Sequence, residues 1–204
     1  MMWTTQPRSE RGGLAAITRG TGPSVLLLHG VGLRAEAWSA QFELPAKITA
    51  PDMSGHGESP WPGQALSFED FVQAALAVLK DMEGPVIIVG HSMGAMLALE
   101  LTNRAPGSVS AVVALNAIFE RSPDAEEKVK SRAAELDGAT IPDPTPTLER
   151  WFGAEMSAER DACERWLRGV DPAAYKSAYT AFATSRIPDQ EGLARLQCPA
   201  LFVT

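Results

Sequence analysis

The pentapeptide Gly-His-Ser-Met-Gly at residues 90–94 constrains the fold of this chain more than any other feature. It follows the apolar run 85–89, which is typical of a buried strand, and precedes residues 95–101, which are typical of a helix. A strand that enters a helix through this pattern makes a sharp, strained turn, which lifts the serine hydroxyl above the sheet edge. The two glycines lack a Cβ atom, so strand and helix can approach closely around Ser92. The N-terminus of the helix would also stabilise negative charge beside that hydroxyl.

Apolar runs alternate with helical patterns along the first half of the chain. Besides the run before Ser92, strands are predicted at residues 14–18, 25–28, 46–52 and 109–115, and helices at 34–42 and 68–79. Ser67 is the predicted N-cap of the second of these helices. Strands that alternate with helices predict an α/β fold, with a mostly parallel sheet flanked by helices.

The pattern changes between residues 119 and 190, where no convincing strand occurs. Helical stretches are predicted there at about residues 123–136, 148–152, 157–167 and 172–184, and the strand pattern returns at 199–204. We therefore expect an α/β core made of residues 1–118 and 191–204. Residues 119–190 would form a helical cap, or lid, over the carboxyl edge of the sheet, where open α/β sheets bind their ligands.

Three segments of the chain resemble the α/β-hydrolase family. They are Leu-His-Gly-Val-Gly at 28–32, Asp-Met-Ser-Gly-His-Gly-Glu-Ser at 52–59 and the pentapeptide at 90–94. Their order is similar to that in the capped, single-domain members, which include esterases, enol-lactonases and carbon–carbon bond hydrolases. The cap sequence resembles 3-oxoadipate enol-lactonase-like hydrolases most. The resemblance implies an α/β-hydrolase fold with a helical cap insertion.

The resemblance also implies a chemistry for Ser92. This serine is the predicted nucleophile, which would form an acyl-enzyme with an ester, lactone or related acyl bond of a small molecule. An oxyanion hole needs two backbone N–H groups, and the resemblance assigns them to Met93, directly after the nucleophile, and to Val31.

Three further side chains are candidates for contacts with the substrate. Trp38 lies near the expected oxyanion loop, and Trp151 belongs to the cap. Arg34 could bind a substrate carboxylate through two parallel hydrogen bonds. The alternatives are a place in the core for each tryptophan and a solvated side chain for the arginine.

The other members of a serine triad are not evident in this chain. The family places the acid and then the histidine after the serine. The sequence has three histidines, none of which follows Ser92, and the resemblance gives all of them structural positions: His29, His56 and His91. One position used for the acid in some members is occupied by Asn116, which is not a carboxylate. We therefore expect the last strand, at least one helix and both missing groups beyond Thr204, in a longer parent protein.

Two functions from different classes therefore stay open. The first is a serine hydrolase, active through Ser92 in the full-length parent. The second is a non-catalytic binding or interaction module that retains the turn around Ser92 as a scaffold. If the last strand is missing, residues 201–204 would leave an exposed sheet edge that invites self-association.

Composition narrows the possible partners. The formal net charge is −7 and the isoelectric point is near 5, which argues against nucleic acid or an anionic membrane as a partner. No apolar run approaches the roughly 20 residues of a membrane helix. Cys163 and Cys198 have no metal-ligand spacing, and we expect reduced thiols, no metal ion and no cofactor. Because residues 1–13 lack the apolar region of a signal peptide, we expect a cytoplasmic protein.

Overall fold

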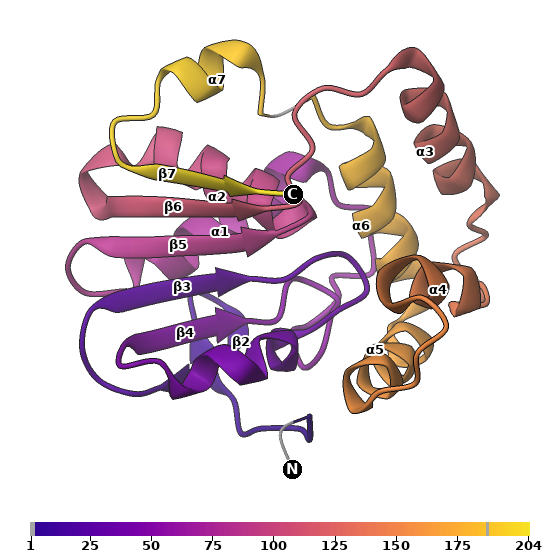
Figure 1. Ribbon diagram of the computed structural model, residues 1–204, viewed down its shortest axis with the longest axis horizontal. Helices are drawn as coiled ribbons and strands as arrows, with labels where there is room; N and C mark the ends of the chain where they lie inside the picture. Colours follow the sequence, from indigo (N-terminus) through magenta and orange to yellow (C-terminus); the bar gives the residue numbers. More distant parts are fainter. Residues whose placement is uncertain (1–2, 187) are drawn as a thin grey trace.

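A central sheet organises the computed structural model, which describes residues 3–186 and 188–204 (Figure 1). Within these residues the sheet has seven strands in the order β1-β2-β4-β3-β5-β6-β7. Their bounds are β1 Ser9–Arg11, β2 Leu14–Arg19, β3 Ser24–Leu28, β4 Lys47–Pro51, β5 Val86–His91, β6 Val109–Leu115 and β7 Ala200–Val203. The five strands from β4 to β7 run parallel, whereas β2 is antiparallel to both β4 and β1. This mostly parallel sheet confirms the predicted α/β class; the short edge strand β1 was not predicted.

Helices cover the sheet and extend beyond one of its edges. Those of the first half are the 3₁₀ helices η1 (Ala35–Glu43) and η2 (Pro106–Ser108) and the α-helices α1 (Phe68–Lys80) and α2 (Met93–Arg104). Those of the second half are α3 Pro123–Glu135, α4 Thr145–Phe152, α5 Ala158–Gly169, α6 Pro172–Thr184 and α7 Gln190–Ala194. Figure 1 shows α3 to α6 beyond the arrowheads of the parallel strands, at their carboxyl ends. No helix among the described residues is long and apolar enough to cross a membrane.

The first long helix begins where the sequence predicts it. Ser67 Oγ accepts a hydrogen bond from the Asp70 N–H, and the Asp70 carboxylate accepts one from the Ser67 N–H at 2.7 Å. This reciprocal capping box satisfies two backbone donors that a helix start would otherwise leave unpaired. The apolar face of α1 then packs against α2 and the sheet.

Both faces of the central strands are buried, which explains their continuous apolar runs. In β3, Leu26 and Leu28 belong to the cluster formed with α1 and α2. Val25 and Leu27 point the other way and belong to the cluster that contains Trp38 of η1. The end of the sheet differs, because all residues of β7 are exposed, with Phe202 49% accessible.

The helices beyond the sheet edge have a small apolar centre of their own. Its buried members are Leu136, Leu148, Leu167, Val170 and Tyr175. Helix α6 also bonds to the core, since Ser177 Oγ accepts a hydrogen bond of 2.7 Å from the Leu66 N–H. These contacts hold α3 to α6 over the carboxyl ends of the strands.

Candidate active site

Ser92 occupies a strained turn between β5 and α2. Its φ of +56° and ψ of −120° are unusual for a residue with a side chain, and Asn116 is the other described non-glycine residue with positive φ. The turn is held from both sides. The Ser92 N–H donates to Leu115 O at 2.9 Å, and Ser92 O accepts from the N–H groups of Ala95 and Met96. Such strain persists only where the surroundings enforce it, which is typical of a nucleophile.

The glycines around this turn are required by close backbone contacts. A Cβ atom on Gly90 would lie 2.1 Å from Gly94 O, and one on Gly94 would lie 2.1 Å from Leu28 O. A Cβ atom on Gly30 would lie 3.3 Å from Ser92 Cβ. The loop that follows β3 therefore lies directly against the serine, as the resemblance implies.

The two N–H groups predicted for the oxyanion hole belong to the segments that flank Ser92. Met93 is the first residue of α2, so its N–H has no acceptor within the helix. Val31 lies in the turn Gly30–Leu33, closed by a hydrogen bond from the Leu33 N–H to Gly30 O at 3.2 Å. No described residue accepts a hydrogen bond from the Val31 N–H. Both groups are thus available as donors, and their role remains a prediction.

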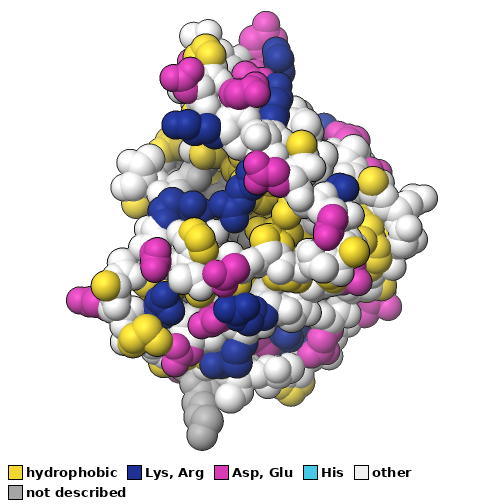
Figure 2. All heavy atoms as spheres, turned by 90° about the vertical axis from the view of Figure 1, so that its right-hand side faces the viewer, with side chains coloured by type: hydrophobic (Ala, Val, Ile, Leu, Met, Phe, Trp, Pro, Cys, Tyr) yellow, Lys and Arg dark blue, Asp and Glu magenta, His cyan; other side chains and the backbone are white. Residues whose placement is uncertain are grey.

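Ser92 lies in a cavity of about 140 Å³ between the sheet and helices α3 to α6, which are called the cap helices below. The core contributes Val31 and Ser92, and the cap contributes Arg132, Arg150 and Trp151. Figure 2 shows Lys and Arg side chains bordering a hollow with apolar side chains on the face formed by the cap helices. This combination suits a small ligand with an apolar part and negative charge.

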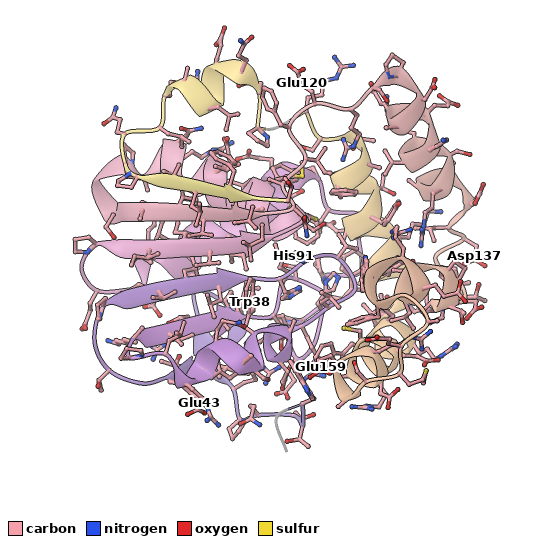
Figure 3. The ribbon with its side chains drawn as sticks, viewed as in Figure 1. Trp38, Glu43, His91, Glu120, Asp137 and Glu159 are labelled. Carbon is pink, nitrogen blue, oxygen red and sulfur yellow. The ribbon has the colours of Figure 1, made fainter. Side chains whose placement is uncertain are left out.

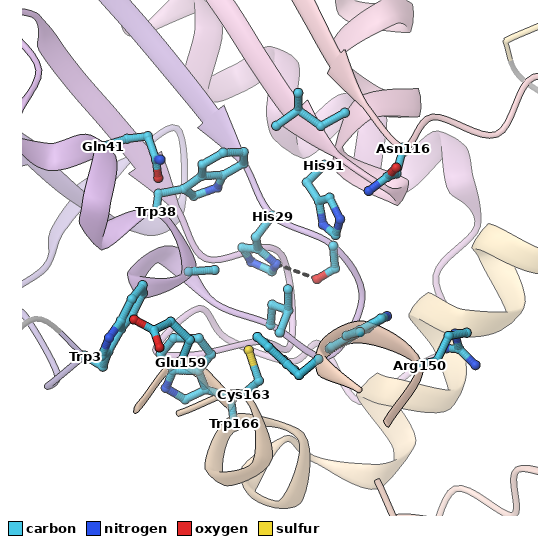
Figure 4. Close-up of a pocket in the computed structure, with 16 residues that line it drawn as sticks. Trp3, His29, Trp38, Gln41, His91, Asn116, Arg150, Glu159, Cys163 and Trp166 are labelled. Atoms are coloured by element: carbon cyan, nitrogen blue, oxygen red, sulfur yellow. Dashed lines mark hydrogen bonds between the residues drawn. The ribbon is translucent and has the colours of Figure 1, made fainter. Parts of the chain in front are cut away.

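A larger cavity of about 540 Å³ adjoins the first, and the two share five lining residues, among them His91, Arg150 and Trp151. Its walls include the predicted contact Trp38, together with Trp3 and Trp166 (Figure 4). Trp38 is only 6% exposed and belongs to the core cluster on the η1 side of the sheet, so it is at once a core residue and a cavity wall. Trp151 is 39% exposed and lines both cavities.

The two cap arginines at Ser92 were not predicted. Arg132 donates a hydrogen bond of 3.0 Å to Thr147 Oγ1, and its guanidinium carbon lies 5.4 Å from the centre of the Tyr179 ring. Arg150 is exposed and makes no hydrogen bond or ion pair within the described residues. In the sequence both are ordinary basic residues in the last turns of helices, where they complement the helix dipole. Only the packing of α3 and α4 brings them to one cavity.

The structure places the third predicted contact, Arg34, elsewhere. Its Nε donates to Glu36 Oε2 at 2.7 Å, and neither cavity is lined by it. Glu36 also accepts from Arg8, which bonds in turn to Asp52. Arg34 is therefore paired with carboxylates of the protein itself, Glu36 and, at 3.7 Å, Glu58.

The histidines have distinct surroundings. His29 and His56 are buried, and burial lowers the pKa of both, that of His56 to about 3. His91 lies where the parallel strands end, facing the cap (Figure 3), and burial lowers its pKa as well. No described side chain donates to or accepts from Ser92 Oγ. The described residues also contain no group of three or more His, Cys, Asp or Glu that could hold a metal ion.

Comparison with known proteins identifies the family. Residues 25–204 match the family described as the alpha/beta hydrolase family. The chain belongs to this family. A relative named (E)-2-((N-methylformamido)methylene)succinate hydrolase, from Acinetobacter baylyi, is 36% identical over 193 residues, which are 91% of this chain and 73% of that protein. Lipase LipV from Mycobacterium tuberculosis is 33% identical over 147 residues, 63% of this chain and 56% of the lipase.

Solved structures support the same fold assignment. The enol-lactonase from Burkholderia xenovorans superimposes with a TM-score of 0.73 at 18% identity, covering 96% of this chain and 80% of the enzyme. An E-2-(acetamidomethylene)succinate hydrolase gives a TM-score of 0.72 at 20% identity, covering 93% and 75%. At these identities the likeness concerns the fold alone. Together with the family match, it confirms that this alpha/beta hydrolase has the fold predicted from its three motifs.

Proposed function

We propose that the full-length protein is a serine hydrolase, which uses Ser92 of this chain to cleave an ester, lactone or related acyl bond of a small molecule. The observation that carries the proposal is the backbone conformation of Ser92. This residue is held at positive φ at the N-terminus of α2 and lines the smaller cavity. A half-buried serine in a strained turn at the wall of a cavity is presented as a nucleophile needs to be. The names of the family relatives, a succinate-derivative hydrolase and a lipase, are in accord with it.

The proposed chemistry begins with attack of Ser92 Oγ on the substrate carbonyl carbon, while the histidine expected beyond Thr204 takes the hydroxyl proton as general base and later gives it to the leaving group. The carbonyl oxygen becomes an oxyanion, which the N–H groups of Val31 and Met93 stabilise. Collapse of this intermediate breaks the acyl bond and releases the protonated leaving group. Water then attacks the acyl-enzyme, and the acid is released with Ser92 restored. His29 and His56 are not the base, because both ring nitrogens of each already face backbone partners.

The cap arginines point to the class of substrate. Arg132 and Arg150 bring two guanidinium groups into the cavity that holds Ser92. Guanidinium groups bind carboxylates through charge-assisted, bidentate hydrogen bonds. The relative from Acinetobacter baylyi is named as a hydrolase of a succinate derivative, which is a compound with carboxylates, and its name supports the same substrate class. The proposed substrate is a small acyl compound with a carboxylate close to the scissile bond.

The alternative function is a binding module that keeps the fold without the chemistry. It is favoured by one observation: among the described residues, nothing accepts the proton of Ser92 Oγ. The two functions differ in whether a covalent intermediate forms.

The deciding experiment is acylation of Ser92 in the full-length protein by an activated ester, followed by intact-mass spectrometry and peptide mapping. A serine hydrolase gains one acyl group on Ser92, and the Ser92→Ala protein gains none while keeping its circular dichroism. Binding of the ester's carboxylate analogue without any acylation would instead support the binding module.

A further inference from the structure

Two buried histidines connect the oxyanion loop to the glycine-rich loop that follows β4. His29 belongs to the first loop, and its Nε2 accepts a hydrogen bond of 2.9 Å from the Met53 N–H of the second. His56 belongs to the second loop, and its Nε2 accepts one of 3.1 Å from the Gly32 N–H of the first. Each loop thus holds the other through a histidine, and the two rings lie 5.4 Å apart between their centres.

These contacts fix the tautomer of each ring. A neutral imidazole whose Nε2 accepts a hydrogen bond must carry its proton on Nδ1. His29 Nδ1–H therefore donates to Gly30 O at 2.8 Å, which is drawn as a dashed line in Figure 4. His56 Nδ1–H likewise donates to Ser54 O at 3.1 Å. Burial keeps both rings neutral, because it lowers their pKa.

The two bonds act on the peptide groups on either side of Val31. The C=O of Gly30 and the N–H of Val31 belong to one planar trans peptide and point in opposite directions. A donor that holds Gly30 O therefore also sets the direction of the Val31 N–H. The next peptide is held through its Gly32 N–H by His56, in a turn where Gly32 has a φ of +78°. A peptide group without such bonds could rotate between alternative turn types. Here the peptide before Val31 is held at Gly30 O, and the peptide after it at the Gly32 N–H.

We propose that His29 and His56 are positioning residues, which aim the Val31 N–H at the oxyanion through their bonds to Gly30 O and to the Gly32 N–H. This inference rests on the proposed function, because it assigns a task to the oxyanion loop of a serine hydrolase. The histidines touch no reacting atom; they act through the backbone. Their roles are opposite in chemical sense: His29 matters as a donor from Nδ1, and His56 as an acceptor at Nε2.

The opposite roles permit a matched test with two amides at each position. An Asn side chain places an amide N–H near the position of Nδ1, whereas a Gln side chain places an amide oxygen near that of Nε2. At position 29 we expect His29→Asn to keep the rate of Ser92 acylation and His29→Gln to lose it. At position 56 we expect the opposite result: His56→Gln keeps the rate of Ser92 acylation, and His56→Asn loses it. The loss expected for a misdirected donor is about 10²-fold, as for removal of an oxyanion-hole donor.

The rates are single-turnover acylation rates of the full-length protein, which carries the expected base. They are measured with an activated ester and with its thionoester, in which sulfur replaces the carbonyl oxygen. Sulfur accepts hydrogen bonds poorly, so the oxygen-to-sulfur rate ratio should fall only in the two impaired variants. A general loss of structure would lower both rates and leave the ratio unchanged. The same order of Asn and Gln at both positions, or an unchanged ratio, overturns the inference.

A second measurement covers variants that fail to fold. The ¹⁵N chemical shifts of the histidine rings in the unsubstituted protein should report the Nδ1–H tautomer for both residues, and an Nε2–H tautomer at either one overturns the inference. The outcomes separate the two proposals. If the unsubstituted protein is never acylated on Ser92, the proposed function fails; if it is acylated and the four variants keep its rate, only the role of the histidines fails.

Discussion

Substitution of the cap arginines offers the sharpest test of the proposed substrate class. We consider Arg132→Gln and Arg150→Gln, which remove the charge and keep a polar side chain of similar length. Both guanidinium groups line the cavity of Ser92, so each should stabilise a bound carboxylate. The change should therefore affect substrates with a carboxylate and spare neutral ones.

The magnitudes differ because the two side chains differ in exposure and support. A hydrogen bond to a charged group contributes about 1.5–3 kcal/mol, and solvent screening reduces this for exposed groups. Arg132 is half-buried and already held by Thr147 and the Tyr179 ring, so it loses little conformational entropy on binding. We expect Arg132→Gln to cost about 2 kcal/mol, or roughly 30-fold in kcat/KM. Exposed Arg150 should contribute less, about 1 kcal/mol, or roughly fivefold.

The assay compares an acyl substrate that carries a carboxylate with its neutral methyl ester, and reports the ratio of their kcat/KM values. Arg168→Gln is the matched control, since this exposed cap arginine pairs with Glu164 and Asp143 and lines neither cavity. Calorimetric titration with succinate, in a Ser92→Ala background, compares the affinity for a carboxylate with and without each arginine in the absence of turnover. If both substrates lose rate equally in Arg132→Gln, or if Arg168→Gln matches it, the carboxylate site is refuted.

Three further outcomes follow from buried charge, buried histidine and the open sheet edge. Glu36→Gln should lower the free energy of unfolding by about 3–5 kcal/mol, because it breaks a buried ion-pair network. The control Glu83→Gln breaks an exposed ion pair and should leave the free energy of unfolding and the melting temperature unchanged. The pKa of His56 falls from 6.5 to about 3 on folding, so the free energy of unfolding should be highest above pH 6.5 and decrease as the pH falls toward 3. Urea titrations at a series of pH values should show a smaller decrease for His56→Gln. Phe202 lies on the exposed strand β7, so Phe202→Lys should reduce any self-association seen by sedimentation velocity; an unchanged profile in an associating protein would argue against pairing at this edge.

The framework of this molecule was predictable because its signals are local. Continuous apolar runs reveal strands that are buried on both faces, and a serine between two glycines at a strand–helix junction specifies the strained turn at Ser92. The strand β1 escaped prediction for a physical reason. Its residues, Ser-Glu-Arg at 9–11, are polar and lie at the sheet edge, so no hydrophobic pattern marks them.

The missed parts of the site depend on contacts between distant segments. Arg132 and Arg150 line the cavity of Ser92 because α3 and α4 lie over the sheet edge, and nothing in the sequence near either residue indicates this convergence. Arg34 shows the converse, a predicted contact that the structure places outside both cavities. It lies close to the oxyanion loop in sequence, yet its charge is neutralised by Glu36, which a single sequence does not reveal.

The contacts beneath the oxyanion loop indicate different roles for the core, which fixes the backbone around Ser92, and for helices α3 to α6, which supply side chains to the cavity. Besides the histidine bonds, Asp52 Oδ1 accepts from the Ala35 N–H at 2.7 Å, so the loop after β3 and the loop after β4 are joined at three separate points. Backbone held in this way has few alternative conformations, which suits N–H donors that must be in place before charge develops. The cap meets this rigid base through side chains, among them Leu167 and Tyr175, which would contact a Cβ atom on Gly32. Under the proposed function, we therefore expect substitutions on α3 to α6 to alter which substrate fits, while the backbone donors of the proposed oxyanion hole stay fixed by the core.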